Sequence, residues 1–241
     1  MTMETLLLFF LFCVGGSVIQ SVTGFGFSIF CMTVFPFLIG NYHAATAISG
    51  MCGATMGICI AWRHRRDINV RLVVPLSVSY FIAFPLGVKL TLILDEDMLL
   101  RVLGGILICL SLYFFFLSDR ISLRPTIVGG LCCGFLGGLF SGFCSIGGPP
   151  VVLYLLAAAK TKEEYRASIQ FYFSVGNSYG VLVRAFNGLI TTQVLGLWIL
   201  ALFALLIGGT IGGKIFNRVN AAVLRRMVYA IMAISGCTML F

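Results

Sequence analysis

The chain has 241 residues, of which 60% are hydrophobic and 10% charged, with a net charge of +8 and a mean hydropathy of +1.07. An average soluble domain carries about 25% charged residues, and a soluble fold of this size cannot bury so much apolar surface. The composition therefore excludes a water-soluble enzyme, a secreted disulfide scaffold and a disordered tail. Because about 20 apolar residues cross a bilayer, it predicts an all-α polytopic membrane protein with about eight apolar segments.

Hydropathy and punctuation place these segments, in chain order, at 5–40, 43–62, 72–94, 98–117, 125–159, 166–186, 192–213 and 222–240. Six of them have the length of a single helix. The other two, 5–40 and 125–159, would each be about 52 Å long as unbroken helix, whereas the hydrocarbon core of a bilayer is about 30 Å thick. Each of these two segments is therefore predicted to break or to turn back as a hairpin.

Glycine and proline mark the predicted breaks, at residues 23–28 and 141–150. Glycine frees the backbone, and proline suits the first turn of a new helix. Close helix packing is the alternative use of glycine in membranes, and we prefer it for Gly104-Gly105 and Gly137-Gly138.

The two halves of the chain show signs of duplication. At an offset of 118 residues, Thr23-Gly24-Phe25 matches Ser141-Gly142-Phe143, and at an offset of 125, Gly87, Lys89 and Arg101 match Gly212, Lys214 and Arg226. Each half has one overlong segment followed by three ordinary ones. We predict a single transmembrane domain over 1–241, built from two four-segment repeats at 5–118 and 119–241, which is a common transporter plan.

The basic residues indicate a membrane orientation rather than nucleic-acid binding, because they form short clusters between apolar runs. In the first repeat the loop at 63–66 is basic and the next, at 95–97, is acidic. In the second repeat the order is swapped: the loop at 186–188 is nearly neutral, and the next connection contains Lys214 and Arg218. The positive-inside rule then predicts inverted repeats with both termini outside, and eight plain crossings with both ends inside are the alternative.

The interior polar residues favour an anion site. Every Asp and Glu lies in a connection or near the N-terminus, whereas membrane cation sites usually rest on buried carboxylates. The second arm of each hairpin would begin with unpaired N–H groups that attract negative charge. We expect the substrate where the hairpin tips meet, and Arg184 either snorkels or faces the permeation path. The predicted binding residues are Thr23, Gly24, Gly26, Ser141, Gly142, Ser145, Gly147 and Gly148, with Gln170 and Asn177 from a neighbouring helix.

Other function classes have less support. An intramembrane hydrolase needs a nucleophile and an oriented base, but the chain has only His43 and His64, and it lacks GxSxG and HExxH motifs. The nine cysteines include no CxxC pair and suit packing, so we expect no catalytic residue, metal or cofactor. A channel-like anion pathway and a passive assembly subunit remain alternatives.

Three stretches resemble the TauE/SafE sulfite-exporter family: TGFGFS at 23–28, SGFCSIGGPPVVLYLL at 141–156 and KTKEEYRASIQFYFSVGN at 160–177. The likeness extends over essentially the whole chain. It implies a multi-pass transporter of the bacterial inner membrane whose substrates are small sulfur-containing or related organic acid anions, such as sulfite, sulfonates or sulfoacetate. The chain departs from the glycine-richest form of the motif at Phe27-Ser28 and at Cys144-Ser145, so the resemblance does not fix the anion.

Overall fold

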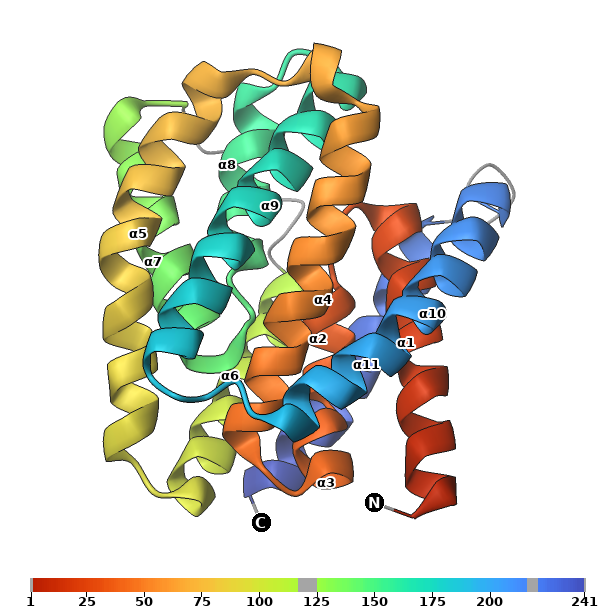
Figure 1. The fold of residues 1–241 in the computed structure, drawn as a ribbon. Coiled ribbons are helices and arrows are strands. Elements are labelled where there is room, and N and C mark those ends of the chain that lie inside the picture. The colour runs from red at the N-terminus through yellow and green to blue at the C-terminus, as the bar shows by residue number, and fades with distance from the viewer. Residues whose placement is uncertain (1, 117–124, 216–220, 241) are drawn as a thin grey trace. The chain divides into compact units, whose positions relative to one another are not determined.

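The computed structural model describes residues 2–116, 125–215 and 221–240, and the regular structure within these ranges is helical (Figure 1). Six helices in the described ranges are long and apolar enough to cross a membrane: α1 (Met3–Thr23), α4 (Tyr42–Arg63), α5 (Val70–Ile93), α6 (Glu96–Phe116), α7 (Ile127–Cys144) and α10 (Thr192–Ile215). The others are α2 (Phe27–Met32), α3 (Phe35–Ile39), the 3-10 turn η1 (Arg65–Asp67), α8 (Gly148–Ala158), α9 (Lys162–Phe186) and α11 (Ala221–Leu240). The all-α prediction is confirmed. The predicted boundary between the repeats, at 118/119, and Arg218 lie outside the described residues.

Both overlong segments are broken within the glycine-rich motifs, as predicted. In the first, α1 ends at Thr23, α2 begins at Phe27, and the returning arm is broken once more before α3. In the second, α7 ends at Cys144 and α8 begins at Gly148. The residues 141–144 of the second motif therefore still belong to the helix.

The returning arms fold back along the helices that precede them. The rings of Phe12 and Phe30 stack with centroids 5.3 Å apart, and those of Phe9 and Phe35 lie 5.0 Å apart. Along α7, a Cβ added at Gly137 would come within 2.9 Å of Val151 Cγ2 on α8. Each overlong segment is thus a hairpin.

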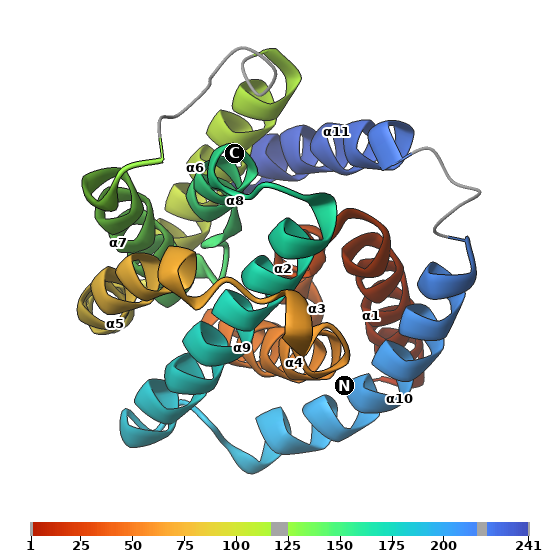
Figure 2. The same ribbon diagram turned by 90° about the horizontal axis from the view of Figure 1, so that it is seen from above.

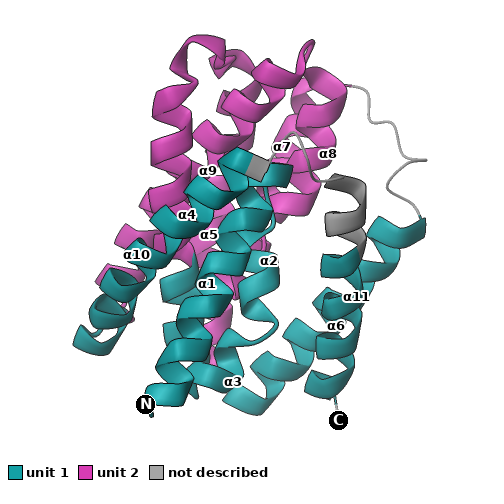
Figure 3. Cartoon of the chain, turned by 90° about the vertical axis from the view of Figure 1, so that its right-hand side faces the viewer, with its two compact units in different colours: residues 1–49, 94–120, 190–241 teal, residues 50–93, 121–189 magenta. Residues whose placement is uncertain are grey.

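The helices form two compact units, and each unit contains helices from both halves of the chain (Figure 3). Unit 1 comprises 1–49, 94–120 and 190–241, and unit 2 comprises 50–93 and 121–189. The division falls within α4, so this helix contributes its first turns to unit 1 and the rest to unit 2. The beginning of α1 and the end of α11 lie at the same end of unit 1 (Figure 3).

In unit 1, α1 lies beside α10 and α6 lies beside α11 (Figure 2). A Cβ on Gly208 would approach Val14 O at 2.5 Å and one on Gly212 would approach Ser21 Cβ at 2.6 Å, so α1 and α10 run parallel. A Cβ on Gly104 would lie 2.7 Å from Gly236 O. The packing role predicted for Gly104-Gly105 is confirmed for Gly104, because only a residue without a side chain permits this approach. It is wrong for Gly105, where an added Cβ would meet no described atom within 4 Å.

In unit 2, α5 and α7 also run parallel, and four glycines of α7 at a spacing of four residues face α5. These are Gly130, Gly134, Gly138 and Gly142. A Cβ on Gly138 would lie 2.8 Å from Tyr80 O, and one on Gly142 would clash with Phe84 O. Gly137 faces the hairpin turn instead, where its Cβ would lie 2.9 Å from Gly147 O. The packing interpretation of Gly137-Gly138 is therefore confirmed.

Candidate functional site

The break in unit 2 is a tight turn with an unusual backbone. Ser145 ends α7 in the left-handed region, with φ 59°, and it is the one described non-glycine residue with a positive φ. This conformation costs a non-glycine residue about 1–2 kcal/mol. Gly147 has no room for a side chain, because a Cβ there would clash with Gly137 O and Ser141 Oγ. Pro149 and Pro150 then occupy the first turn of α8, where the N–H groups they lack would be unpaired in any case.

Arg184, in the last turn of α9, places its guanidinium at this break. Its side chain is 3% exposed, and Nη2 donates to Ser141 O and to Ser145 Oγ, each at 3.0 Å. The guanidinium carbon lies 5.0 Å from the ring centroid of Phe84, in a cation–π arrangement. The end of a helix presents carbonyl oxygens and a partial negative charge, which explains why a cation is stable there. A permanent positive charge is therefore held inside unit 2, and Arg184 does not snorkel outward.

The polar residues of α9 share one face with Arg184, and this face packs on glycines of α4. The face consists of Gln170, Ser174, Asn177 and Arg184, which are at helical spacing. A Cβ added at Gly50 would lie 3.0 Å from Arg184 Nη1, and one at Gly53 would lie 2.8 Å from Asn177 Nδ2. At Gly57 it would lie 2.8 Å from the backbone N of Ser174. Because glycine has no side chain, these three positions of α4 leave room for the polar face of α9.

The neighbouring face of α9 packs on aromatic residues of α5. A Cβ on Gly176 would lie 3.1 Å from Tyr80 Cζ, and one on Gly180 would lie 2.6 Å from Phe84 Cζ. The Tyr80 and Tyr172 rings meet edge to face with centroids 5.5 Å apart. These contacts fix the ring of Phe84 beneath the guanidinium.

The hydroxyl of Tyr172 is a buried donor near the hairpin turn. Tyr172 is 1% exposed, and its hydroxyl has no hydrogen-bond partner among the described residues. A Cβ on Gly137 would lie 3.0 Å from this hydroxyl and 2.9 Å from Gly147 O. Because buried polar groups are nearly always paired, this hydroxyl is available to a ligand or a water molecule.

The break in unit 1 is closed by groups of the same hairpin. Gly24 and Gly26 have φ values of 85° and 106°, which glycine adopts without strain. The Thr23 hydroxyl donates to Ile19 O at 2.8 Å or to Phe25 O. The side chain of Gln20 accepts from the backbone N–H of Phe27 at 3.2 Å. The Thr23 hydroxyl, which was predicted to bind the anion, is therefore used within the turn.

The predicted site residues thus fall into separate groups. Unit 2 brings Ser141, Ser145 and Gly147 together with Arg184. Gly142 faces α5, and Gly148 opens α8 beside the ring of Phe173. Gln170 and Asn177 lie along the face of α9 that packs on α4, and Thr23, Gly24 and Gly26 form the turn of unit 1. Among the described residues, no three His, Cys, Asp or Glu side chains converge as a metal site would require.

Several residues at this site did not enter the predicted set. From the sequence, Arg184 had two alternative positions, and the G-x₂-G-x₃-G spacing of Gly50, Gly53 and Gly57 was not among the predicted features. That spacing was a readable signal for a close helix contact. The role of Tyr172 has no signal in the sequence, because its position depends on how α9 packs.

Comparison with known families gives a match over nearly the whole chain. The family described as Sulfite exporter TauE/SafE matches residues 8–239, which include both hairpins and the helices between them. No curated protein and no solved structure gives a significant match.

Proposed function

Because the chain belongs to the sulfite exporter TauE/SafE family, a family of membrane transporters, we propose that it carries small sulfur-containing oxyanions, such as sulfite or sulfonates, across the cell membrane. The chain is accordingly a multi-pass membrane protein. The anion is the proposed substrate, and the bilayer is the surrounding partner.

One observation carries this proposal: the buried guanidinium of Arg184 at the break between α7 and α8. A guanidinium presents its N–H donors as a planar fork that matches two oxygens of a carboxylate, phosphate or similar oxyanion. Ser145 and Tyr172 bring hydroxyl groups to the same hairpin. A site of this kind stabilises a small anion without a counter-cation.

We propose that the substrate binds in unit 2, at Ser141, Ser145, Gly147, Gly148 and Arg184. Gly147 permits the close turn against Gly137 and Ser141, and Gly148 begins α8. Gln170 and Asn177 continue the polar face of α9 away from the break. For the unit 1 turn, formed by Thr23, Gly24 and Gly26, we propose a shaping role, because the Thr23 hydroxyl already donates to its own backbone. Gly142 serves the contact with α5.

We also propose that the chain consists of two inverted repeats. The support is that α1 lies parallel to α10 and α7 lies parallel to α5, so the hairpin helix of each half pairs with the second ordinary-length helix of the other. The matched glycines Gly87 and Gly212 approach Leu139 and Ser21, which are themselves 118 residues apart. A transporter built from two duplicated halves would show the same helix pairing twice, as the two units do.

Labelling from the two sides of the membrane tests the orientation. Single cysteines near His64 should react only from the cytoplasm, and those near Glu96 only from outside, because the loop at 63–66 is strongly basic. A C-terminal alkaline phosphatase fusion should be active. An inactive phosphatase fusion together with a fluorescent GFP fusion would refute the inverted arrangement.

A flux screen in proteoliposomes tests the function itself. Purified protein is reconstituted, and uptake of sulfite, sulfate, thiosulfate, taurine and sulfoacetate is compared with that of liposomes containing the Arg184→Gln variant. We expect saturable uptake of at least one sulfur oxyanion by the wild type and a large loss in the variant. Conductance that rises linearly with concentration would instead indicate a channel, and the absence of anion flux would refute the proposal.

A further inference from the structure

One end of unit 2 is formed by two connections that hydrogen bonds hold together. The turn between α4 and α5 meets the turn between α8 and α9 through Asn69 and Glu164. Asn69 Nδ2 donates to Glu164 Oε1 at 2.6 Å, and the Asn69 backbone N–H donates to Ser168 Oγ at 3.1 Å. The other carboxylate oxygen of Glu164 accepts from the Lys160 backbone N–H at 2.8 Å. The two turns therefore form one continuous surface.

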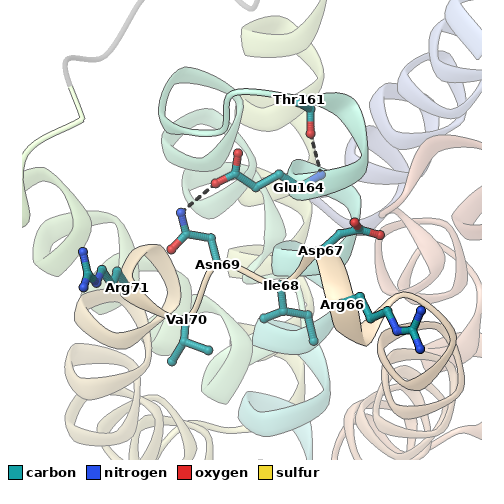
Figure 4. Close-up of a pocket in the computed structure, with 8 residues that line it drawn as sticks. All are labelled: Arg66, Asp67, Ile68, Asn69, Val70, Arg71, Thr161 and Glu164. Carbon is teal, nitrogen blue, oxygen red and sulfur yellow. Dashed lines mark hydrogen bonds between the residues drawn. The ribbon is translucent and has the colours of Figure 1, made fainter.

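This surface contains an open hollow of about 520 Å³ (Figure 4). Arg66 and Arg71 flank it, and Asp67, Thr161 and Glu164 also contribute to its lining. Figure 4 shows Arg66 and Arg71 on opposite sides, with Asn69 and Glu164 joined between them. Both oxygens of Glu164 accept hydrogen bonds from donors of unit 2, which fixes the position of this carboxylate but leaves its negative charge in place. The excess of positive charge at the hollow therefore comes from the residues around it.

The surroundings of the hollow are strongly basic. The cationic residues of the two turns and the adjoining helix ends are Arg63, Arg65, Arg66, Arg71, Lys160, Lys162 and Arg166, and the anionic ones are Asp67, Glu163 and Glu164. The pKa of His64 is lowered, first by burial and then by the charges of Arg166 and Arg63, against the opposite effect of Asp67. The excess of positive charge on this surface comes from its arginines and lysines, which outnumber its acidic residues.

An exposed apolar stripe begins inside the hollow and runs down α5. Val70 lines the hollow, and Val74, Val78 and Ile82 follow at a spacing of four residues. All four are at least half exposed, and residues at this spacing lie on one side of a helix. On a membrane-spanning helix such a stripe faces the acyl chains of the lipid.

An aromatic residue marks the membrane interface beside the hollow. Trp62, in the last turn of α4, is 72% exposed, and Arg65 Cζ lies 5.2 Å from the centroid of its ring. Tryptophan is enriched where membrane helices meet the headgroup layer. The hollow therefore lies at headgroup depth, with charge around it and an apolar stripe leading away from it.

We propose that this hollow binds the headgroup of an anionic phospholipid, with its phosphate at Arg66 and Arg71 and one acyl chain along the stripe from Val70 to Ile82. Basic pockets at the ends of membrane helices have the charge that anionic headgroups require. The apolar stripe distinguishes a lipid from a soluble phosphate, which would gain nothing from it. This site is separate from the Arg184 site, so each can be tested without the other.

Lipid titration of the purified full chain in detergent tests the proposal. Binding of phosphatidylglycerol and of phosphatidylcholine is measured by native mass spectrometry for the wild type, for R66Q/R71Q and for K89Q/R101Q. The last variant is a matched control that removes two exposed cationic residues elsewhere. We expect the wild type to prefer phosphatidylglycerol and R66Q/R71Q to bind it about 30-fold more weakly, about fivefold for each charge. The control should bind within twofold of the wild type.

A conservative variant and a soluble competitor complete the test. R66K/R71K keeps both charges, so its affinity should stay within a few-fold of wild type, which separates loss of charge from loss of fold. Glycerol phosphate, which lacks acyl chains, should not displace the lipid at equal concentration. Equal binding of both lipids, unchanged binding by R66Q/R71Q, or efficient displacement by glycerol phosphate would overturn the proposal.

Discussion

The two hairpin turns of this protein have the same architecture, but the groups that form hydrogen bonds at each turn differ. Each follows a long membrane helix, reverses direction with a residue in the left-handed conformation, and starts a returning helix. At the turn of unit 1, the hydrogen bonds come from Thr23 and Gln20 of the preceding helix. At the turn of unit 2, Arg184 reaches in from α9.

The two turns also differ in backbone strain and in buried charge. Gly24 and Gly26 provide the positive φ angles of the first turn without strain, and the Thr23 hydroxyl and the Gln20 side chain form hydrogen bonds within the same hairpin. The second turn has a strained serine and a buried cation, and strain of this sort concentrates at functional sites. We therefore propose that the turn of unit 1 shapes the protein and that the turn of unit 2 binds the anion.

The largest expected effect concerns the space inside the second turn. Gly147→Ala should prevent folding of the hairpin, because the new Cβ would clash with Gly137 O and Ser141 Oγ. Gly148→Ala is the matched control, since its Cβ would meet Phe173 only at 3.4 Å. The yield of monodisperse protein after size exclusion should fall several-fold for Gly147→Ala alone. Equal yields for the two variants would show that this turn is not tightly packed.

The next effect compares the hydroxyl groups of the two turns. Ser145→Ala should raise the substrate concentration for half-maximal flux by about tenfold, because a hydrogen bond to a charged group contributes about 1.5–3 kcal/mol. Thr23→Val should leave this concentration within twofold and act on stability instead. Flux measured against substrate concentration for both variants decides the point.

Ser145→Gly serves as the control for backbone strain in that experiment. It relieves the positive φ of this position and also removes the hydroxyl. We expect Ser145→Gly to lose affinity as Ser145→Ala does. Wild-type affinity in Ser145→Gly would mean that the backbone conformation matters and the hydroxyl does not.

A smaller effect is expected from the buried hydroxyl of Tyr172. Tyr172→Phe removes a donor that is unpaired among the described residues, so the melting temperature of the substrate-free protein should stay the same or rise. Apparent affinity for the anion should fall about three- to tenfold. A lower melting temperature with unchanged affinity would assign the hydroxyl to the fold.

The smallest effect concerns the connection between the two turns at the basic end of unit 2. The pKa of Glu164 is lowered from its ordinary value of 4.5. The main cause is the hydrogen bond from Asn69, and hydrogen bonds from the backbone of Lys160 and Thr161 add to it. Its contribution to stability is therefore present above that value and is lost as the pH falls through the lowered pKa. Thermal melts from pH 6 to pH 3 should show a slightly steeper acid loss for the wild type than for Glu164→Gln. Superimposable curves would show that this contact does not contribute.

The sequence predicted the elements that depend on local composition. The breaks near Gly24 and Gly147 follow from glycine and proline within segments too long for one crossing, and the segment predicted at 192–213 corresponds to α10. The pairing of helices was not predictable in the same way, because lipid-facing and protein-facing surfaces are both apolar. The anion site was predicted at both turns from the same motif, and only the packing of α9 distinguishes them.

Arg184 tests the central claim most directly. Half-maximal substrate concentration is measured in proteoliposomes for wild type, Arg184→Lys and Arg184→Gln, with the amount of folded protein quantified for each. A buried guanidinium that binds the anion predicts about a 10- to 100-fold increase for Arg184→Gln and a smaller one for Arg184→Lys, which keeps the charge and loses the fork. An unchanged half-maximal concentration in Arg184→Gln, at normal levels of folded protein, would contradict the account.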